Sequence, residues 1–317
     1  DAGDLLLREV STRLNALSRF SETFYRLGGD EFAFLSSGLT EAAAVSRARE
    51  ISDSISKPYT INNQLIKIAT CVGIVLSDNE RRSDYLYKFA DLALYEAKKE
   101  GSQQIKVFRQ RMLQKLQESR TLENDMARAI ENDEFIVYYQ PIVNSVSKEI
   151  YGYEALIRWM HPVKGMLSPD SFIFAAEKTG MIKEIGKNVL KLACREAVSW
   201  AVPARISVNV SPVQLGSKSF INTVQSVLAE TGLPANRLEL EVTESSLFSD
   251  RNNPIAILKK LRSLGVRISI DDFGTGYSSL SRLSELNFDK IKIDKSFVNP
   301  ISTQEDALNI VTLITGT

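Results

Sequence analysis

The sequence predicts an α+β domain followed by an α/β domain of the (β/α)8 barrel type. At 317 residues the chain exceeds one average domain of roughly 100–200 residues. Helical and strand-like patterns mix irregularly over residues 1–108, whereas over 134–317 they alternate about every 30 residues. Between these regions, residues 109–133 are highly charged, have helical periodicity and contain no Pro or Gly. We therefore expect two domains joined by a helical connector.

The first region predicts helices packed on an antiparallel sheet. Apolar residues recur at helical spacing over residues 5–17, 41–55 and 86–100. The strand-like apolar runs are TFYRL, EFAFL and IKIATCVGIVL. This mixture is typical of an α+β domain.

The second region predicts parallel strands connected by crossover helices. FIVYYQPIV and EIYGYEALIRW are strand-like, and then the strand-like runs RISVNVS, RLELEVTE, VRISIDDFG and DKIKID alternate with helical stretches such as VLKLACREAVSWA and PIAILKKLRSLG. A (β/α) barrel needs about eight strands. Since only six are found, we expect the C-terminal part of the barrel to be absent from this chain.

Composition excludes several classes of function. The 39 Lys and Arg balance 39 Asp and Glu, which leaves no basic field for nucleic acid or for an anionic membrane surface. No run approaches ~18 consecutive apolar residues, and the first residues lack the layout of a secretory signal. We expect a cytoplasmic segment without membrane contact, whose parent protein has room for a membrane tether ahead of Asp1.

Acid, base or metal chemistry must depend on carboxylates. Cys71 and Cys194 lie inside apolar runs without a second Cys or His nearby, which predicts buried, reduced thiols. His161 is the only histidine, so a His-rich metal site is excluded.

Polar side chains recur near the ends of the predicted barrel strands, where barrel enzymes place their chemistry. They are Glu154, Asn209, Glu241, Glu244, Asp271, Asp272 and Lys292. Hard oxygen ligands on several strands suit Mg²⁺ or Mn²⁺ better than Zn²⁺. The adjacent Asp271 and Asp272 reach one site only where their strand ends, and together they can serve two metals about 3.5–4 Å apart.

Two other interpretations fit the same residue types. Acidic residues at strand ends also cap helices or contact solvent, although their recurrence on consecutive strands argues against this for the whole set. An enolase-like enzyme also places acidic ligands and a Lys base on successive barrel strands. The residue types therefore predict a metal-binding barrel without defining its substrate.

A Gly-Gly hairpin is the other chemical feature. Gly28 and Gly29 separate two apolar strands, as in a tight turn that needs positive φ. Asp30 and Glu31 follow directly, where bare backbone admits a nucleotide triphosphate and Asp30 can ligate Mg²⁺. A plain acidic hairpin is the alternative.

The second region resembles the EAL-type cyclic di-GMP phosphodiesterases through YYQPIV, YGYEALIRW, SVNVSP, LELEVTES, DDFGTGYSSL and KIKIDKSF, in this order. The resemblance implies a magnesium or manganese site with two metals. Its ligands would be Glu154, Asn209, Glu241 and Asp271, and Asp272 would hold the second metal or its bridging water.

The resemblance also implies roles around the metals. Lys292 would orient the water or stabilise phosphate charge, and Glu244 would brace the DDFGTGYSSL loop. Gln140 and Arg158 would hold the substrate, since an amide suits a base or ribose edge and a guanidinium suits phosphate oxygens. The family carries a further glutamate in a motif like AEGVE, which this chain does not reach.

The first region resembles GGDEF diguanylate cyclases, which have a nucleotidyl-cyclase palm-like fold, through AGDLLLREV, RLGGDEF and FADLALYEAKKEG. The resemblance implies that Asp30 binds metal, Glu31 contacts the nucleotide, Asp4 contacts guanine and Lys98 meets phosphates. GTP would then be a ligand and a homodimer the active form, because each of two domains supplies one GTP.

Three departures separate this region from the cyclases it resembles. The family's first strand would precede Asp1, and Ser102 stands where an Arg is frequent. Arg19 and Glu22 occupy the place of the RxxD product-inhibition site, with Glu for Asp.

Three functions follow from these observations. The first is metal-dependent hydrolysis of cyclic di-GMP to linear pGpG. The second is synthesis of cyclic di-GMP from two GTP. The third is a regulatory module that binds cyclic di-GMP or GTP without turnover.

Overall fold

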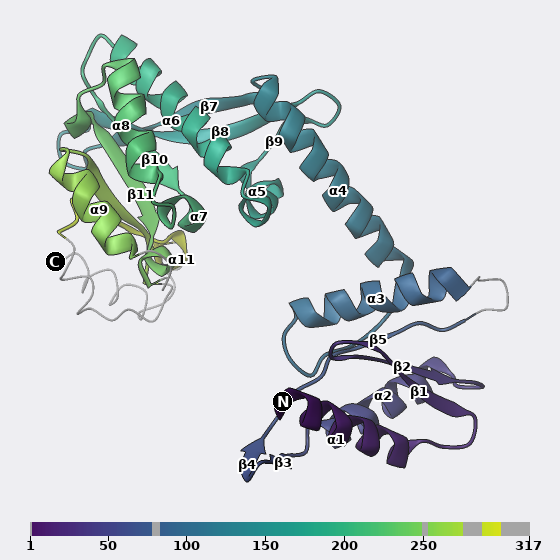
Figure 1. Cartoon of the computed structure of the whole chain (residues 1–317). Coiled ribbons are helices and arrows are strands. Elements are labelled where there is room, and N and C mark those ends of the chain that lie inside the picture. The colour runs from purple at the N-terminus through teal and green to yellow at the C-terminus, as the bar shows by residue number, and fades with distance from the viewer. Residues whose placement is uncertain (1, 78–82, 249–252, 275–286, 299–317) are drawn as a thin grey trace. The chain divides into compact units, whose positions relative to one another are not determined.

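The computed structural model describes residues 2–77, 83–248, 253–274 and 287–298. Its contacts divide the chain into two compact units, Asp1–Glu118 and Ser119–Thr317. Figure 1 labels most of the helices and strands of both units. Among the described residues, no helix is both long and apolar enough to span a membrane.

The first unit contains helices and three pairs of short strands. In chain order its elements are α1 (Ala2–Leu17), β1 (Glu22–Gly28), β2 (Glu31–Ser36), α2 (Glu41–Ile55), β3 (Tyr59–Ile61), β4 (Gln64–Ile66), β5 (Val72–Ile74), α3 (Ser83–Lys99) and β6 (Ile105–Val107). The predicted helices and the hairpin are present. The core of α1 and α2 is formed by Val10, Leu14, Ile51 and Ile55.

The strand pairing differs from the antiparallel sheet that the sequence suggests. Strands β1 with β2 and β3 with β4 are antiparallel, but β5 and β6 are parallel because α3 connects them as a crossover. The run IKIATCVGIVL is not one strand, since only Ile66 lies in β4 and only Val72–Ile74 lie in β5. At Gly73 a Cβ would lie 2.2 Å from the Ala90 carbonyl oxygen, so the close approach of α3 to β5 requires glycine.

Helix α4 (Gln110–Glu131) occupies the segment predicted as a helical connector. The division between the two units falls within this helix. Met112 belongs to the core of the first unit, and Met126 to that of the second.

The second unit is built on one large sheet. Its strands are β7 (Phe135–Val143), β8 (Ile150–His161), β9 (Gly165–Leu167), β10 (Arg205–Val210), β11 (Leu238–Thr243), β12 (Arg267–Phe273) and β13 (Lys290–Ile293). Its helices are α5 (Ile173–Thr179), α6 (Ile182–Ser199), α7 (Pro212–Leu215), α8 (Phe220–Thr231), α9 (Pro254–Ser263) and α11 (Lys295–Val298), with short 3-10 turns at Pro169–Ser171, Ala235–Arg237 and Glu244–Phe248.

All six strands predicted for the second region form, in the order β13-β12-β11-β10-β8-β7. Strands β8, β10, β11, β12 and β13 are parallel. Strand β7 is antiparallel to β8, because a short hairpin loop joins them in place of a crossover helix. The described residues form an open path of strands, without closure into a barrel.

The two faces of this sheet have different chemistry. Ile206, Leu240 and Ile268 are fully buried on one face, which Figure 1 shows lined by α6, α8 and α9. Because successive side chains of a strand alternate between faces, the residues between them point to the opposite face. Those residues are polar: Ser207, Asn209, Glu239, Glu241, Arg267, Ser269, Asp271, Lys290 and Lys292.

Candidate active site

Strand register places the predicted acidic residues side by side. Asn209 of β10 pairs with Glu241 of β11, and Glu241 pairs with Ser269 of β12. Glu154 of β8 lies opposite Ser207, which precedes Asn209 by two residues on the polar face. Residues from neighbouring strands thus reach one point on this face.

Lys292 of β13 joins these residues. Its Nζ donates hydrogen bonds to Glu154 Oε2 at 3.3 Å, to Asp271 Oδ2 at 3.0 Å and to Glu241 Oε2. Asn209 Nδ2 donates to the other oxygen of Glu154 at 2.8 Å. Five strands each contribute one residue to this cluster, which we call the acidic ring.

Burial and charge set the protonation of the ring. Burial raises the pKa of Glu241 and neighbouring Glu154 adds to this, although Lys292 opposes it. Burial acts to lower the pKa of Lys292, but Glu241, Glu154 and Asp271 together outweigh it and raise that pKa. Lys292 is therefore an ammonium at physiological pH, and its single positive charge offsets part of the negative charge of the three carboxylates.

Strand β12 distorts where the adjacent aspartates lie. Its pairing with β13 is irregular between Ile270 and Phe273, and Asp272 has φ 53°, in the left-handed region. Asp272 N donates to Asp271 Oδ1 at 3.0 Å. Burial raises the pKa of Asp272, and the charges of Asp271 and Asp294 raise it further. Asp271 joins the ring, whereas Asp272 is turned by the bulge toward Asp294.

Glu244 contacts the start of the predicted loop. Its side chain is buried, and Oε2 accepts a hydrogen bond from Gly274 N at 3.0 Å. Residues 275–286 of the loop lie outside the described residues. Gly274 is the last described residue of the DDFGTGYSSL segment, and the bracing role of Glu244 stays a prediction.

The two predicted substrate residues lie on the β7–β8 pair. Gln140 is exposed and stands directly opposite Glu154 in the register, next to the ring. Arg158 lies further along β8, where Nη1 donates to the Ile157 carbonyl oxygen at 2.7 Å and the guanidinium lies 5.6 Å from the Tyr138 ring centroid. Gln140 is thus placed beside the acids, and Arg158 is placed apart from them.

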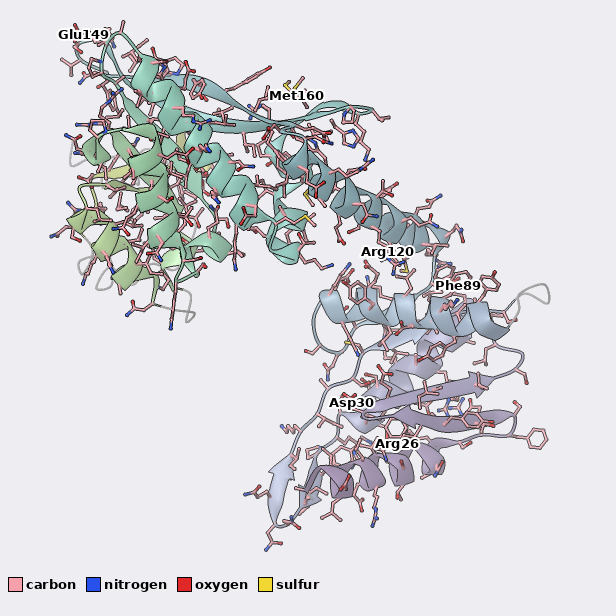
Figure 2. All side chains as sticks on the ribbon, turned by 45° about the horizontal axis from the view of Figure 1, so that its top comes forward. Arg26, Asp30, Phe89, Arg120, Glu149 and Met160 are labelled. Carbon is pink, nitrogen blue, oxygen red and sulfur yellow. The ribbon has the colours of Figure 1, made fainter. Side chains whose placement is uncertain are left out.

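The Gly-Gly hairpin of the first unit is held by its own arginine. Arg26 donates from Nε and Nη2 to the Gly29 carbonyl oxygen at 3.1 and 2.8 Å. Figure 2 labels Arg26 and Asp30 in this unit. Gly29 has φ 53°, which favours glycine. Asp30 and Glu31 are exposed at the tip, and Lys98 Nζ lies 4.0 Å from Glu31 Oε1.

Other predicted residues of the first unit lie elsewhere. Asp4 is exposed in the first turn of α1. Glu22 is buried in an ion pair with Arg47 at 2.6 Å, and Arg19 pairs with Glu50 at 2.7 Å. The residues at the place of the product-inhibition site are therefore engaged with their own chain.

Comparison with known families matches both halves. The EAL domain model matches residues 123–317, more than half of the chain. The chain belongs to the EAL domain family. The model "Diguanylate cyclase, GGDEF domain" matches residues 1–104, so this EAL protein also carries a GGDEF domain.

Relatives share this two-domain arrangement. An uncharacterized signaling protein of Caulobacter vibrioides is 42% identical over 99% of this chain and 39% of its own length. The bifunctional diguanylate cyclase/cyclic di-GMP phosphodiesterase MucR of Pseudomonas aeruginosa is 38% identical over 98% of this chain and 46% of its own length. The chain thus spans less than half the length of these relatives.

A solved structure supports the fold of the EAL half. The structure titled "PaMucR Phosphodiesterase, c-di-GMP complex" is 38% identical, with a TM-score of 0.59, and covers 62% of this chain and 81% of that one. The EAL enzyme Bd1971, in a form bound to cAMP and cyclic di-GMP, is 33% identical with a TM-score of 0.58 over 63% of this chain and 56% of that one.

The donor set of the EAL half fits a hard divalent cation. Three carboxylates and an amide come together, and Glu241 Oε1 is buried without a hydrogen-bond partner. In the part of the chain that is described, no three His, Cys, Asp or Glu residues form a ready metal cluster. Lys292 lies among the acids, so a metal would compete with its ammonium for the same oxygens.

Sequence reasoning missed a second set of charges in the EAL half. Glu239 and Lys290 lie one step below the ring on the same face and pair at 2.6 Å. Their signal was available, because ELE and KIK each place two charged residues at alternate positions of one strand.

Proposed function

We propose that the EAL half of this chain hydrolyses cyclic di-GMP to linear pGpG with divalent cations. The observation that supports this most is the acidic ring, in which Glu154, Asn209, Glu241 and Asp271 converge from consecutive strands around Lys292. MucR, a relative of this chain, is named a phosphodiesterase in a structure with cyclic di-GMP.

Each residue then has a defined task. Glu154, Asn209, Glu241 and Asp271 would hold the first of two Mg²⁺ or Mn²⁺ ions, and Asp272 would hold the second. Bound divalent ions polarise a phosphodiester and lower the pKa of a bound water.

The remaining residues serve the substrate and the loop. Lys292, once separated from the acids, offers its ammonium to a phosphate oxygen or to the attacking water. Gln140, which lies beside Glu154, would bind a base or ribose edge, and Arg158 a phosphate. Glu244 holds Gly274, so it fixes where the DDFGTGYSSL loop leaves the sheet.

Product analysis tests this function. The full-length protein is incubated with cyclic di-GMP and Mg²⁺ or Mn²⁺, and nucleotides are separated by chromatography. Glu154→Ala should lose more than about 100-fold in turnover, since outer-shell residues alone cost about 10–100-fold. Glu149→Ala, an exposed glutamate of the hairpin after β7, is the matched control and should keep wild-type turnover. Equal turnover in Glu154→Ala and wild type would refute the assignment.

Binding without turnover is the alternative for the same site. It predicts cyclic di-GMP binding by calorimetry together with no pGpG at any metal concentration.

A second function, nucleotide binding by the GGDEF half, is favoured by the hairpin. Gly28 and Gly29 expose backbone beside Asp30 and Glu31, and Lys98 lies near Glu31. GTP with Mg²⁺ is the proposed ligand, Asp4 the proposed guanine contact and a homodimer the form in which two GTP would be joined. Calorimetry with Mg²⁺-GTP on wild type and Asp30→Asn tests it, and equal affinity would refute a role for Asp30.

We further propose that 1–108, 109–133 and 134–317 are the functional divisions and that this part of the protein lies in the cytoplasm. Support for the divisions comes from α4 at Gln110–Glu131 and from family matches over 1–104 and 123–317.

A further inference from the structure

A second tier of buried charge lies directly below the acidic ring. Glu239 is 2% exposed, and its Oε1 accepts hydrogen bonds from Ser207 Oγ at 2.9 Å and from Lys290 Nζ at 2.6 Å. Glu239 stands opposite Ser207 in the β10–β11 register, so this tier repeats the strand order of the ring. None of these three residues belongs to the ring.

Lys290 connects the two tiers. Its Nζ lies 3.5 Å from Glu241 Oε1, the buried oxygen that has no hydrogen-bond partner. The other oxygen of Glu241 accepts from Lys292. Two lysines at alternate positions of β13 therefore contact the two oxygens of Glu241: Lys290 of the second tier contacts Oε1, and Lys292 of the ring contacts Oε2.

The two lysines differ in what holds them. Lys292 is shared among Glu154, Glu241 and Asp271, the same oxygens that a metal would require. Lys290 is anchored by Glu239, outside the ring, and is mostly buried with 21% of its side chain exposed. A cation that displaces Lys292 thus leaves Lys290 in place.

We propose that Lys290, anchored by Glu239, is a positioning residue that fixes Glu241 as a metal ligand. This inference rests on the metal-dependent function proposed above. With Lys290 against Oε1, the buried carboxylate keeps a counter-charge and directs Oε2 toward the ring. Outer-shell partners of ligating groups typically change metal affinity or activity by about 10–100-fold.

The competing explanation is that Lys290 only neutralises Glu239. Removing one member of a buried ion pair strands the other charge and weakens the fold, whereas neutralising both members does not. The double variant Glu239→Gln/Lys290→Met leaves neither charge, and the amide oxygen introduced at position 239 can still accept from Ser207. Arg267, which approaches Glu239 to 3.8 Å, retains Asp289 at 3.3 Å. This variant separates positioning from stability.

The experiment measures Mn²⁺ binding by calorimetry on the full chain and, in parallel, cyclic di-GMP turnover. The variants are Lys290→Met, Lys290→Arg and Glu239→Gln/Lys290→Met, with Lys259→Met on the exposed side of α9 as the matched control. We expect Mn²⁺ affinity about 10–100-fold weaker in Lys290→Met and in the double variant, with recovery in Lys290→Arg. KM for cyclic di-GMP should stay within about twofold while kcat falls at limiting metal.

Wild-type Mn²⁺ affinity in the double variant would overturn the inference and assign Lys290 to fold stability. Absence of Mn²⁺ binding by wild type would also overturn it. Wild type that binds Mn²⁺ but makes no pGpG would refute the proposed hydrolysis, and the calorimetric comparison would still decide the role of Lys290.

Discussion

Replacing Lys292 with Met should destabilise the EAL half, because Glu154 and Asp271 lose the ammonium that they share and Glu241 keeps only Lys290, at 3.5 Å. The ammonium contacts Glu154, Asp271 and Glu241, and its side chain is only 25% exposed. Removing one partner of a buried ion pair costs about 3–5 kcal/mol. The side chains of Glu154 and Asp271 are 18% and 20% exposed, so solvent stabilises them in part. We therefore expect a loss in the free energy of unfolding at the lower end of this range, about 3 kcal/mol at pH 7 without added metal.

The expected loss corresponds to a clear thermal shift. For a unit of this size about 1 kcal/mol lowers Tm by about 2–4 °C, so the variant should melt roughly 6–12 °C below wild type. Trp159 and Trp200 are the only tryptophans and both lie in the second unit, so their fluorescence follows the unfolding of that unit.

The pH dependence has a definite sign. Burial already raises the pKa of Glu241, and Lys292 is a charge that counteracts this, so its removal raises that pKa further. A raised pKa in the folded state favours the protonated carboxyl, so the penalty is largest at neutral pH. The difference in the free energy of unfolding between wild type and Lys292→Met should decrease as pH falls through the raised pKa of Glu241 toward 4.5, the ordinary glutamate value.

A bound divalent metal, like a fall in pH, should reduce the stability difference between Lys292→Met and wild type. An ion that binds only the folded state at 100 times its Kd stabilises it by about 2.7 kcal/mol, and the variant offers oxygens without a competing ammonium. Mg²⁺ should therefore raise Tm more in the variant than in wild type, whereas Lys292→Arg should resemble wild type. Wild-type stability of Lys292→Met at pH 7 would refute the role of Lys292 as counter-charge of the ring. A stability difference that is the same at pH 7 and pH 5 would also refute it.

Two further predictions concern packing and charge elsewhere. Gly186→Ala should cost about 1–3 kcal/mol in urea unfolding, because its Cβ would lie 2.0 Å from Nε2 of Gln214, a buried side chain that cannot move without losing its hydrogen bond from Ser211 N. Lys187→Ala, at an exposed position, should change the urea midpoint little, and equal midpoints for the two variants would contradict this. Burial would raise the pKa of Glu22, but hydrogen bonds from Arg47 and Arg19 N lower it, so this stabilisation is present above pH 4.5 and is lost as pH falls through the lowered pKa. Hydrogen-exchange protection of β1 and α2 should fall on acidification in wild type and should fall less in Glu22→Gln. Identical pH profiles of protection in the two proteins would contradict this prediction.

Much of the second unit could be predicted from local pattern. Runs such as RISVNVS and RLELEVTE become β10 and β11 because their apolar residues alternate with residues that face the other side. Asn209 and Glu241 meet because parallel register brings equivalent positions together. The direction of β7 was missed because the strand–helix rhythm was extended to it, although the loop after Val143 is too short for a crossover.

Other features depend on tertiary contacts that a linear pattern does not contain. The central residues of IKIATCVGIVL leave the strand, so Cys71 is only partly buried, and its Sγ donates to the Gly101 carbonyl oxygen at 3.1 Å. Glu239 and Lys290 were not predicted as site residues, because each lies two positions before the ring residue of its strand and not at the strand end. The sequence does not predict that Lys292 lies among the acids, where a metal was expected, because this depends on the conformations of the side chains.

The two-tier arrangement of charge also constrains how the EAL half can fold. Glu239 and Glu241 lie on β11, but the lysines that neutralise them lie on β13, on the far side of β12. A partly assembled sheet that contains β11 without β13 would leave Glu241 without either lysine and Glu239 with only Arg267, at 3.8 Å, which is unfavourable for buried carboxylates. Strands β11, β12 and β13 should therefore acquire hydrogen-exchange protection together, as one cooperative unit whose last strand brings the neutralising charge.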